Sequence, residues 1–379
     1  IIRSVRHQNK SRRSAQLSCR AYENGVQCMF RILVKLSFVF CLNVGISPLF
    51  AVDEQYGVSL TVPEDPNGNT DIISDLTFSG DGQMLAVAYG KFTGLLQEPH
   101  PGQTIVWDIK SGRRLTTLRS YLDGVSSVDF SKDGKLLATG SYDGTVQLWS
   151  SSNWRRQTRI KATQGTVTSL HFCPQTSTLA VGTWQDKEGS LKNTINLYQA
   201  STGRQIANLE GHTEEGIMSV QYSPDCREIV SSAMDGSVRI WNVISGTNRV
   251  IYQTDTAWFY SVAFSSDGQL MAAVGGDLPT RKWHIRVWDA KTWKLNLELN
   301  GEGRPLNSVT VSHDNQWLAA ASRDGDVKLW NLVEKQSIKL SQPASRTALS
   351  PDGKVIALAH GRVVRLFRIE QFVEKAKGN

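Results

Sequence analysis

The sequence predicts an all-β protein, a propeller of seven four-stranded antiparallel blades, and two observations support this prediction. Short runs of alternating apolar and polar residues follow one another with Gly, Pro, Asp and Ser between them, as in β-strands joined by tight turns. An aromatic residue also recurs every 37 to 49 residues of the 379-residue chain, at Trp107, Trp149, Tyr198, Trp241, Trp288, Trp330 and Phe367. A period of about 40 to 45 residues with four short strands is typical of a β-propeller.

Three strands in each unit lead up to the recurring aromatic residue. They are 75–78, 84–88 and 104–109 in the first unit, 125–130, 136–141 and 145–149 in the second, and 167–172, 179–183 and 194–198 in the third. The fourth unit has 217–222, 228–233 and a strand ending at Trp241, and the fifth is marked by Trp288. The sixth has 309–311, 317–322 and 327–330, and the seventh has 346–349, 355–359 and 363–369. Weaker outer strands follow, as at 113–118, 204–209 and 294–299, where Lys and Arg discourage edge-to-edge pairing.

Asp-Gly pairs mark the turns inside the units. Asp143-Gly144 and Asp235-Gly236 join the second and third strands of their units, and Ser-x-Asp-Gly joins the first and second strands at 131–134 and 350–353. Glycine readily adopts the positive φ that such tight turns require. The turns therefore predict short antiparallel hairpins.

The seventh unit has only three strands before the charged, unpatterned segment 371–379. A strand near the start of the chain, at about 58–62, belongs to no other unit. We expect it to complete the last blade, because joining the two ends of the array removes an exposed edge and closes the ring.

The repeat resembles the WD40 family over roughly residues 56–370. The resemblance rests on Gly211-His212, on the Ser-x-Asp-Gly turns, and on the dipeptides Trp107-Asp108 and Trp288-Asp289. Trp241-Asn242 and Trp330-Asn331 nearly keep the same dipeptide. The resemblance implies a propeller and a member of a family that commonly assembles other proteins.

The positive charge of the chain does not indicate a nucleic-acid partner. The net charge is +7, but residues 1–51 hold eight Lys and Arg and one Glu, which accounts for all of it. Residues 52–379 are neutral overall and lack the clustered positive charge that phosphate binding needs. We therefore expect no nucleic acid among its partners.

The first 51 residues contain a predicted leader. Arg31 and Lys35 precede the apolar run 36–44, and Ala51 precedes an acidic start, which is the pattern of a signal peptide over 29–51. A retained anchor is the alternative, although 36–51 is shorter than the ~20 residues of a spanning helix. Residues 1–28 are interpreted as an over-extended gene start or a disordered segment, and 52–379 as a single propeller. This interpretation predicts a secreted or periplasmic monomer with no membrane span after cleavage.

Two cysteines, Cys173 and Cys226, lie beyond the leader, at turn positions of adjacent units. They are offset by three positions in the aligned turns, so we expect free thiols rather than a disulfide.

A polar set in the fourth unit comprises His212, Ser231, Asp235 and Trp241, and the second unit has a partial copy, Thr139, Asp143 and Trp149. Serine, histidine and aspartate could form a hydrolase triad, but a buried indole N–H also needs an acceptor. Because the set recurs, we interpret it as structural. The His residues show no metal-ligand spacing and no phosphate-binding loop is present, so we expect no catalytic, cofactor or metal site.

Three connections between second and third strands are long, at 89–103, 184–192 and 276–283. The family resemblance places them on one face, together with the inter-blade loop 255–260. Exposed aromatic and Arg side chains on a rigid frame are typical of partner-binding sites, with local packing as the alternative. The candidate partner-binding residues are Trp258, Trp283, His284, Phe92, Trp184 and Arg281.

The sequence thus predicts an exported, non-catalytic scaffold that binds a protein or peptide. The alternative is an enzyme acting on a small substrate in the central funnel. Such an enzyme needs ionisable groups on the inner strands, where Asp75 and Asp129 are the only carboxylates and where we expect no cation or His.

Overall fold

The structure, a computed structural model, describes residues 58–62, 72–90, 102–119, 122–185, 193–213, 216–312 and 314–372. The predicted start and signal peptide, 1–28 and 29–51, lie outside these residues, as does Phe92. The described strands all belong to one unit of the chain, Phe50–Asn379.

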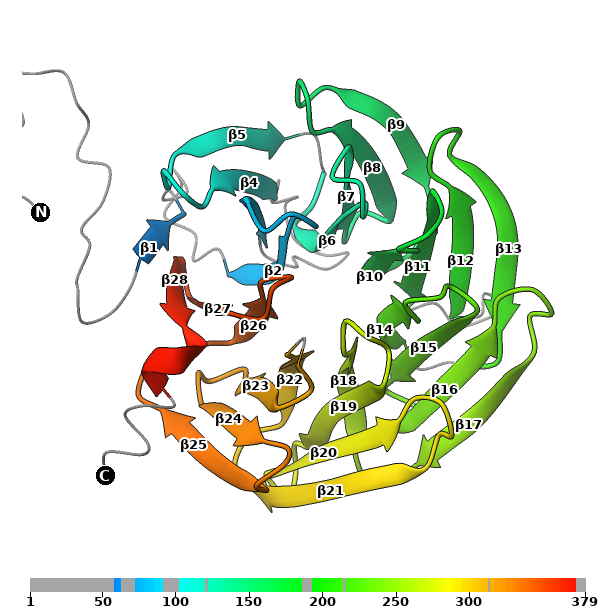
Figure 1. The fold of residues 1–379 in the computed structure, drawn as a ribbon. Helices are drawn as coiled ribbons and strands as arrows, with labels where there is room; N and C mark the ends of the chain where they lie inside the picture. Colours follow the sequence, from blue (N-terminus) through cyan, green and yellow to red (C-terminus); the bar gives the residue numbers. More distant parts are fainter. Residues whose placement is uncertain are drawn as a thin grey trace, which may run out of the picture. The chain divides into compact units, whose positions relative to one another are not determined.

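Seven antiparallel sheets of four strands surround an axis, as Figure 1 shows, so the predicted fold class is confirmed. Blade 1 contains β2 (Ile73–Phe78), β3 (Met84–Tyr89), β4 (Gln103–Asp108) and β5 (Arg114–Arg119). Blade 2 contains β6 (Val125–Phe130), β7 (Leu136–Ser141), β8 (Thr145–Ser150) and β9 (Arg156–Lys161). Blade 3 contains β10 (Thr166–Phe172), β11 (Thr178–Trp184), β12 (Thr194–Gln199) and β13 (Arg204–Glu210).

The remaining blades repeat this order. Blade 4 contains β14 (Ile217–Tyr222), β15 (Glu228–Ala233), β16 (Ser237–Asn242) and β17 (Asn248–Gln253). Blade 5 contains β18 (Trp258–Phe264), β19 (Leu270–Asp277), β20 (Lys282–Asp289) and β21 (Leu295–Glu302). Blade 6 contains β22 (Leu306–Val311), β23 (Trp317–Ser322), β24 (Val327–Asn331) and β25 (Gln336–Leu340). Blade 7 contains β26 (Arg346–Leu349), β27 (Val355–His360), β28 (Val363–Arg368) and β1 (Val58–Thr61), and one helical turn, 369–372, follows β28.

The first strands of the blades line the axis. Each contacts the first strand of the next blade, and β26 contacts β2, so the ring is closed. Between neighbouring blades lies a core to which both contribute; Trp241, for example, is fully buried between blades 3 and 4. The recurring aromatic residues therefore lie in the cores that hold the blades together.

The N-terminal strand completes blade 7 as predicted. β1 pairs antiparallel with β28, with Leu60 opposite Val364. Val62 N donates to Arg362 O at 2.9 Å, and the Arg362 guanidinium donates back to Val62 O, also at 2.9 Å. The side chains of Leu60 and Val62 are buried, so this strand contributes to the core as well as to the sheet.

The expectation of free thiols is wrong, because Cys173 and Cys226 form a disulfide between blades 3 and 4, with their Cα atoms 5.6 Å apart. In adjacent blades, the turns between the first and second strands pack against each other. The fourth residue of each turn lies against the turn of the preceding blade. A Cβ on Gly268 would lie 3.2 Å from Pro224, and Gln175 Nε2 donates to Pro224 O at 3.1 Å. This packing brings Cys173 and Cys226 together, although they occupy different positions in the aligned turns.

We predict that Leu60→Ala destabilises the ring by about 2–5 kcal/mol, because it removes a buried side chain from the strand that closes the ring. Urea unfolding followed by tryptophan fluorescence measures the loss. Ser59→Ala, on the exposed side of the same strand, is the control and should change little. Equal stability of the two variants would contradict this role of β1.

Candidate interaction surface

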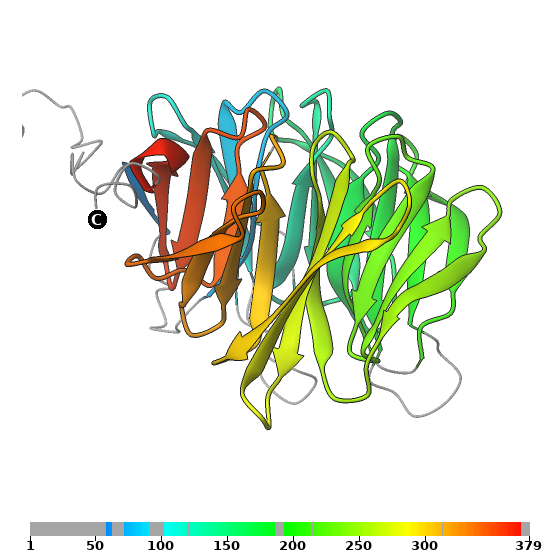
Figure 2. The same ribbon diagram turned by 60° about the horizontal axis from the view of Figure 1, so that its bottom comes forward.

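The candidate residues are gathered at the face where the first strands begin. Because strands alternate in direction within a blade, the connection between the second and third strands lies at this same face. Figure 2 shows that the hairpin between β19 and β20 projects furthest at the lower edge of the ring. We call this surface the loop face.

Blade 5 aligns two of the predicted tryptophans in one row of residues. Trp258 of β18 is opposite Gly276, Gly276 is opposite Trp283 of β20, and Trp283 is opposite Gly301 of β21. Residues directly opposite one another project from the same side of a sheet. The structure therefore places Trp258 and Trp283 on the same side of one blade, two strands apart.

Trp283 is anchored, whereas Trp258 is more open. The Trp283 indole donates from Nε1 to Glu302 O at 2.8 Å and packs edge-to-face on Trp330, with ring centres 5.9 Å apart. The ammonium group of Lys328 lies 4.7 Å from the Trp283 ring centre. Trp258 contacts Tyr260 edge-to-face and keeps 38% of its surface exposed. Trp258 is thus the more accessible of the two.

The other candidates divide between this hairpin and a different blade. Arg281 is exposed in the turn, with φ of 54°, and its carbonyl accepts from Gly303 N at 2.8 Å. His284 is half-buried, and its Nδ1 lies 2.7 Å from Asn300 Oδ1. Trp184 ends β11 in blade 3 and packs over Gly216, where a Cβ would lie 2.5 Å from the indole. Trp184 is therefore separate from the blade 5 group.

Three exposed apolar side chains on the loop face were not among the candidate residues. Leu122, which is 65% exposed, and Ile72 lie just before the first strands of blades 2 and 1. Leu278, in the β19–β20 hairpin, is also exposed. In the sequence, Leu122 is a leucine between two predicted strands, and it lacks the aromatic character by which the candidate residues were recognised.

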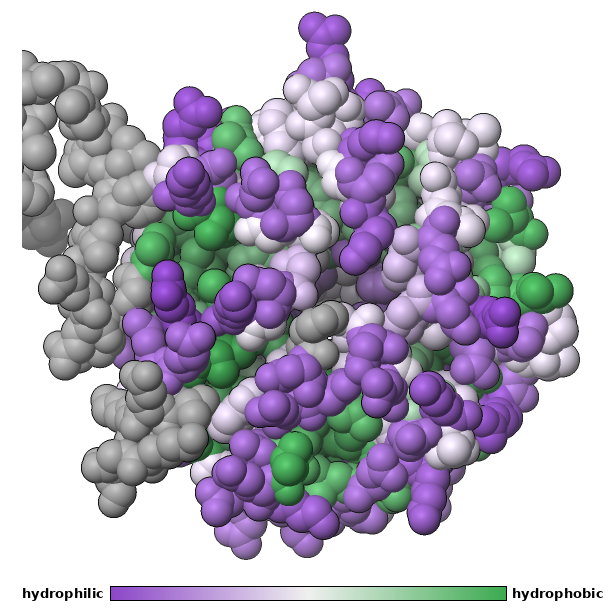
Figure 3. Space-filling model, viewed as in Figure 1, coloured by the Kyte–Doolittle hydropathy of each residue, from purple (hydrophilic) through white to green (hydrophobic). Residues whose placement is uncertain are grey.

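The opposite face also carries exposed apolar side chains. Figure 3 is drawn from that side and shows mainly hydrophilic residues, with smaller hydrophobic areas among them. Ile244 and Val333, in turns between third and fourth strands, are the most exposed large apolar residues of the described chain, at 93% and 73%. They stand in different blades, 4 and 6.

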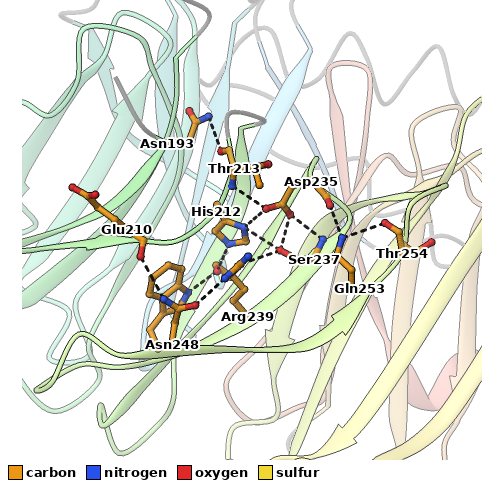
Figure 4. A network of polar contacts seen from close by, with 12 residues as sticks. Asn193, Glu210, His212, Thr213, Asp235, Ser237, Arg239, Asn248, Gln253 and Thr254 are labelled. Carbon is orange, nitrogen blue, oxygen red and sulfur yellow. Dashed lines mark hydrogen bonds and ion pairs between the residues drawn. The ribbon is translucent and has the colours of Figure 1, made fainter. Parts of the chain in front are cut away.

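The polar set of blade 4 forms one continuous chain of hydrogen bonds, drawn in Figure 4. Trp241 Nε1 donates to Ser231 Oγ at 2.7 Å, and Ser231 Oγ lies 2.7 Å from His212 Nε2. His212 Nδ1 lies 2.9 Å from Asp235 Oδ2. With His212 neutral and protonated on Nδ1, every N–H and O–H of the chain has an acceptor.

Burial and hydrogen bonding together set the charges in this network. It lowers the pKa of His212 and outweighs the opposing effect of Asp235, so the imidazole is neutral at pH 7. Burial also acts to raise the pKa of Asp235, but hydrogen bonds from His212 and Ser237 outweigh it and hold that pKa below its usual range. His212 and Ser231 are buried, and the set connects loop, turn and core.

Blade 2 keeps part of this arrangement. Trp149 Nε1 donates to Thr139 Oγ1 at 2.9 Å, and Asp143 Oδ2 accepts from Leu122 N at 3.0 Å. In blade 4 the corresponding bond runs from Thr213 N to Asp235. Both aspartates therefore hold in place the loop that leads into the first strand of their own blade.

The expectation that no cation or histidine joins the carboxylates of the inner strands is wrong. Arg346 begins β26, and its charge acts on Asp75. His171 lies in β10 and accepts a hydrogen bond from Tyr222 N at 3.2 Å, and burial lowers its pKa to about 4.

Asp129 is a second buried acid of the axis with a raised pKa. Burial raises its pKa to about 8, and the nearby charge of Asp75 adds to the rise. Its Oδ2 accepts from Phe172 N of the next blade at 2.7 Å. Asp129 therefore links blades 2 and 3 largely in its neutral form at pH 7.

Comparison with known proteins now decides the family. The family described as "WD domain, G-beta repeat" matches residues 112–150, 203–242 and 293–331. The small ribosomal subunit protein RACK1y of Oryza sativa subsp. japonica is 30% identical over 289 residues, which cover 73% of this chain and 82% of that protein. The chain belongs to the WD40-repeat family.

Other relatives of this WD40 propeller are longer or more distant. The periodic tryptophan protein 2 homolog of Dictyostelium discoideum is 26% identical over 260 residues, covering 67% of this chain and 22% of that protein. The target of rapamycin complex subunit wat1 of Schizosaccharomyces pombe is 23% identical over 235 residues, covering 59% and 70%. The chain thus spans less than a quarter of the length of the periodic tryptophan protein it matches.

The expected secreted or periplasmic location is contradicted by these relatives. Two of their names refer to the small ribosomal subunit and to the target of rapamycin complex, which operate inside cells. In the described ranges we find no helix whose length and hydropathy would let it cross a bilayer. Nor do those ranges contain a group of three or more His, Cys, Asp or Glu side chains arranged to hold a metal ion.

We predict that Ser231→Ala destabilises the WD40 propeller by about 1–3 kcal/mol, because it leaves the buried Trp241 N–H and His212 Nε2 without their partner. Ser231→Thr is the matched control, since Thr139 holds Trp149 in the same way in blade 2. Thermal unfolding of the two variants measures the difference. If the alanine variant were as stable as the threonine variant, the hydrogen-bond network would not contribute to the stability of the propeller.

We predict that Asp129→Asn removes part of the pH dependence of stability. A raised pKa in the folded state means that the contribution of Asp129 is present at acid pH and is lost as pH rises from about 4 through about 8. Asparagine mimics the neutral acid and can still accept from Phe172 N. At pH 9 the variant should exceed the wild type by at least about 1.4 kcal/mol, the equivalent of one pKa unit.

Urea unfolding at pH 5, 7 and 9 tests this, with similar stability of the two proteins expected at pH 5. A wild type that is the more stable protein at pH 9 would show that Asp129 is ionised and favourably paired.

Proposed function

We propose that this WD40 propeller is a non-catalytic scaffold whose loop face binds a protein or peptide partner. One observation carries the proposal. Four of the eight large hydrophobic side chains that are exposed in the described part of the chain lie on this face, namely Ile72, Leu122, Trp258 and Leu278. Exposed apolar and aromatic residues held at the ends of a rigid fold are suited to protein recognition.

The closed ring makes such a surface effective. Trp258 begins β18 and pairs with Gly276, so its backbone is part of the sheet rather than of a free loop. Trp283 is held by its bond to Glu302 O and by Trp330. Because these residues are already held in place, binding a partner here costs little conformational entropy in the propeller. A low entropic cost favours affinity.

Arg281 and Lys282 add positive charge at the same hairpin, beside the exposed Leu278. An apolar centre with a charged rim is common in protein interfaces. Trp258, Trp283, His284 and Arg281 of blade 5 are therefore the residues that we propose to contact a partner first. Trp184 would contribute only to a partner broad enough to reach blade 3.

The axial groups support a scaffold rather than an enzyme. Both oxygens of Asp75 accept hydrogen bonds from the protein, Oδ1 from Leu76 N and Oδ2 from Val128 N and Ser127 Oγ. His171 Nδ1 is occupied by Tyr222 N. These groups are committed to joining blades, and we infer that they do not perform chemistry.

The relatives agree with this kind of role, since two of them are named as a small ribosomal subunit protein and as a subunit of the target of rapamycin complex. Both names describe members of larger assemblies. We extend only the general role, binding other proteins, to this chain.

We predict that Trp258→Ala with Leu278→Ala lowers partner binding at least tenfold without altering thermal stability, because contacts on the loop face are lost while the core is untouched. Affinity capture from the source cells identifies a partner, and titration calorimetry with that partner measures the change. Ile244→Ala with Val333→Ala, on the opposite face, is the matched control. It truncates two side chains that are more exposed than Trp258 and Leu278. Loss of binding in the control pair but not in the loop-face pair would move the site to the other face.

A further inference from the structure

The disulfide between blades 3 and 4 occupies two turn positions at which other blades carry different residues. In the other six blades, the turn between the first and second strands begins with a serine, whose Oγ accepts from the backbone N–H five residues later. These serines are Ser79, Ser131, Ser223, Ser265, Ser312 and Ser350. Cys173 stands at this position in blade 3, so its turn has a sulfur in place of the hydroxyl acceptor.

Cys226 occupies the fourth position of the blade 4 turn, with φ of 58°. Glycine holds this position in four other blades, with φ between 67° and 69°, at Gly82, Gly134, Gly268 and Gly353. Positive φ is unfavourable for a residue with a side chain but not for glycine. Each cysteine therefore replaces the residue that suits its own turn, and the bond between the two sulfur atoms is what the exchange provides.

The two sulfur atoms have different surroundings. Cys226 is half-buried between the exposed residues Asp225 and Arg227, whereas Cys173 is only 2% exposed. Cys173 Sγ accepts two hydrogen bonds from Thr176, from N at 3.2 Å and from Oγ1 at 2.9 Å. Cys226 Sγ accepts one longer bond, from Gln175 N at 3.4 Å. Because hydrogen bonds to sulfur favour the thiolate, Cys173 is the better leaving group and Cys226 the more accessible sulfur.

We propose that Cys173 and Cys226 form a reversible redox site, at which a low-molecular-weight thiol such as glutathione opens and re-forms the link between blades 3 and 4. The thiolate of the small molecule attacks Cys226 Sγ, forms a mixed disulfide there and displaces Cys173 as a thiolate, which Thr176 stabilises. A second small thiol attacks the small-molecule sulfur of the mixed disulfide and releases Cys226.

The reaction is balanced. Two small thiols lose two electrons and leave joined as their own disulfide, while their two protons pass to the two protein cysteines, which end as thiols. The reverse reaction closes the bond again. Reduction leaves the boundary between blades 3 and 4 with two residues that are unfavourable in their own turns and no bond between them.

Thermal unfolding of the full chain, oxidised and reduced, tests the consequence for stability. The matched variant is Cys173→Ser with Cys226→Gly, which gives both positions the residues of the other blades. Dithiothreitol should lower the Tm of the wild type by about 5 °C, the shift expected for loss of a typical disulfide, and should not change that of the double variant. The reduced wild type should also melt below the double variant. A reduced wild type that melts at or above the double variant would contradict this account of the two positions.

Equilibration of the folded protein in glutathione buffers tests reversibility, with alkylation and mass spectrometry to count free Cys173 and Cys226. The share of intact bond should fall as the reduced share of glutathione rises, and it should recover when the buffer is reversed. A bond that stays intact in reduced glutathione until urea unfolds the protein would be a permanent structural link, and the proposal would be wrong.

Thr176→Val tests the role of the leaving sulfur, because it removes the hydroxyl donor with little change in size and keeps both cysteines. It should slow reduction of the folded protein by glutathione at least about threefold. Thr176→Ser keeps the hydroxyl and should restore the wild-type rate. A merely loosened turn would speed reduction instead, so the direction of the change separates the two effects. Equal rates in all three proteins would overturn the assignment of Cys173 as the leaving sulfur.

Discussion

The pairing of β1 with β28 is the contact on which the rest of the ring depends. It joins the two ends of the repeat array, and it does so without a covalent bond, through backbone pairing and the burial of Leu60 and Val62. Every hydrophobic core of this propeller lies between two blades, so each blade needs a neighbour on both sides. An open array would leave two such cores half exposed at its ends.

Closing the ring creates a second constraint, because it crowds polar backbone around a narrow axis. Buried N–H groups need acceptors, and serine provides one with little bulk. A belt of Ser127, Ser169, Ser219, Ser261 and Ser308 meets this need at successive boundaries. The same rigidity that the belt and cores provide fixes the bases of the loops, which is the property a binding surface requires.

Repetition explains which features could be predicted. The aromatic positions, the turns and the closing strand were predictable because each recurs or is missing at a fixed place in the repeat. The Cys173–Cys226 disulfide and the bond from Arg346 of blade 7 to Ser74 of blade 1 were not, because each occurs once and depends on contact between different blades. The predicted location failed for another reason: it rested on residues 29–51 alone, and the relatives contradict it.

The candidate surface was likewise predictable only in part. The sequence pointed to Trp258 and Trp283 as aromatic residues in departures from the repeat, but it could not tell an anchored indole from an open one. By itself the sequence determined the number of blades, the pattern of strands and the buried aromatic positions, because these follow from local periodicity. Only the tertiary structure decided which cysteines join, which residue of blade 1 Arg346 contacts and which tryptophan stays exposed, because these depend on distances between residues far apart in the chain.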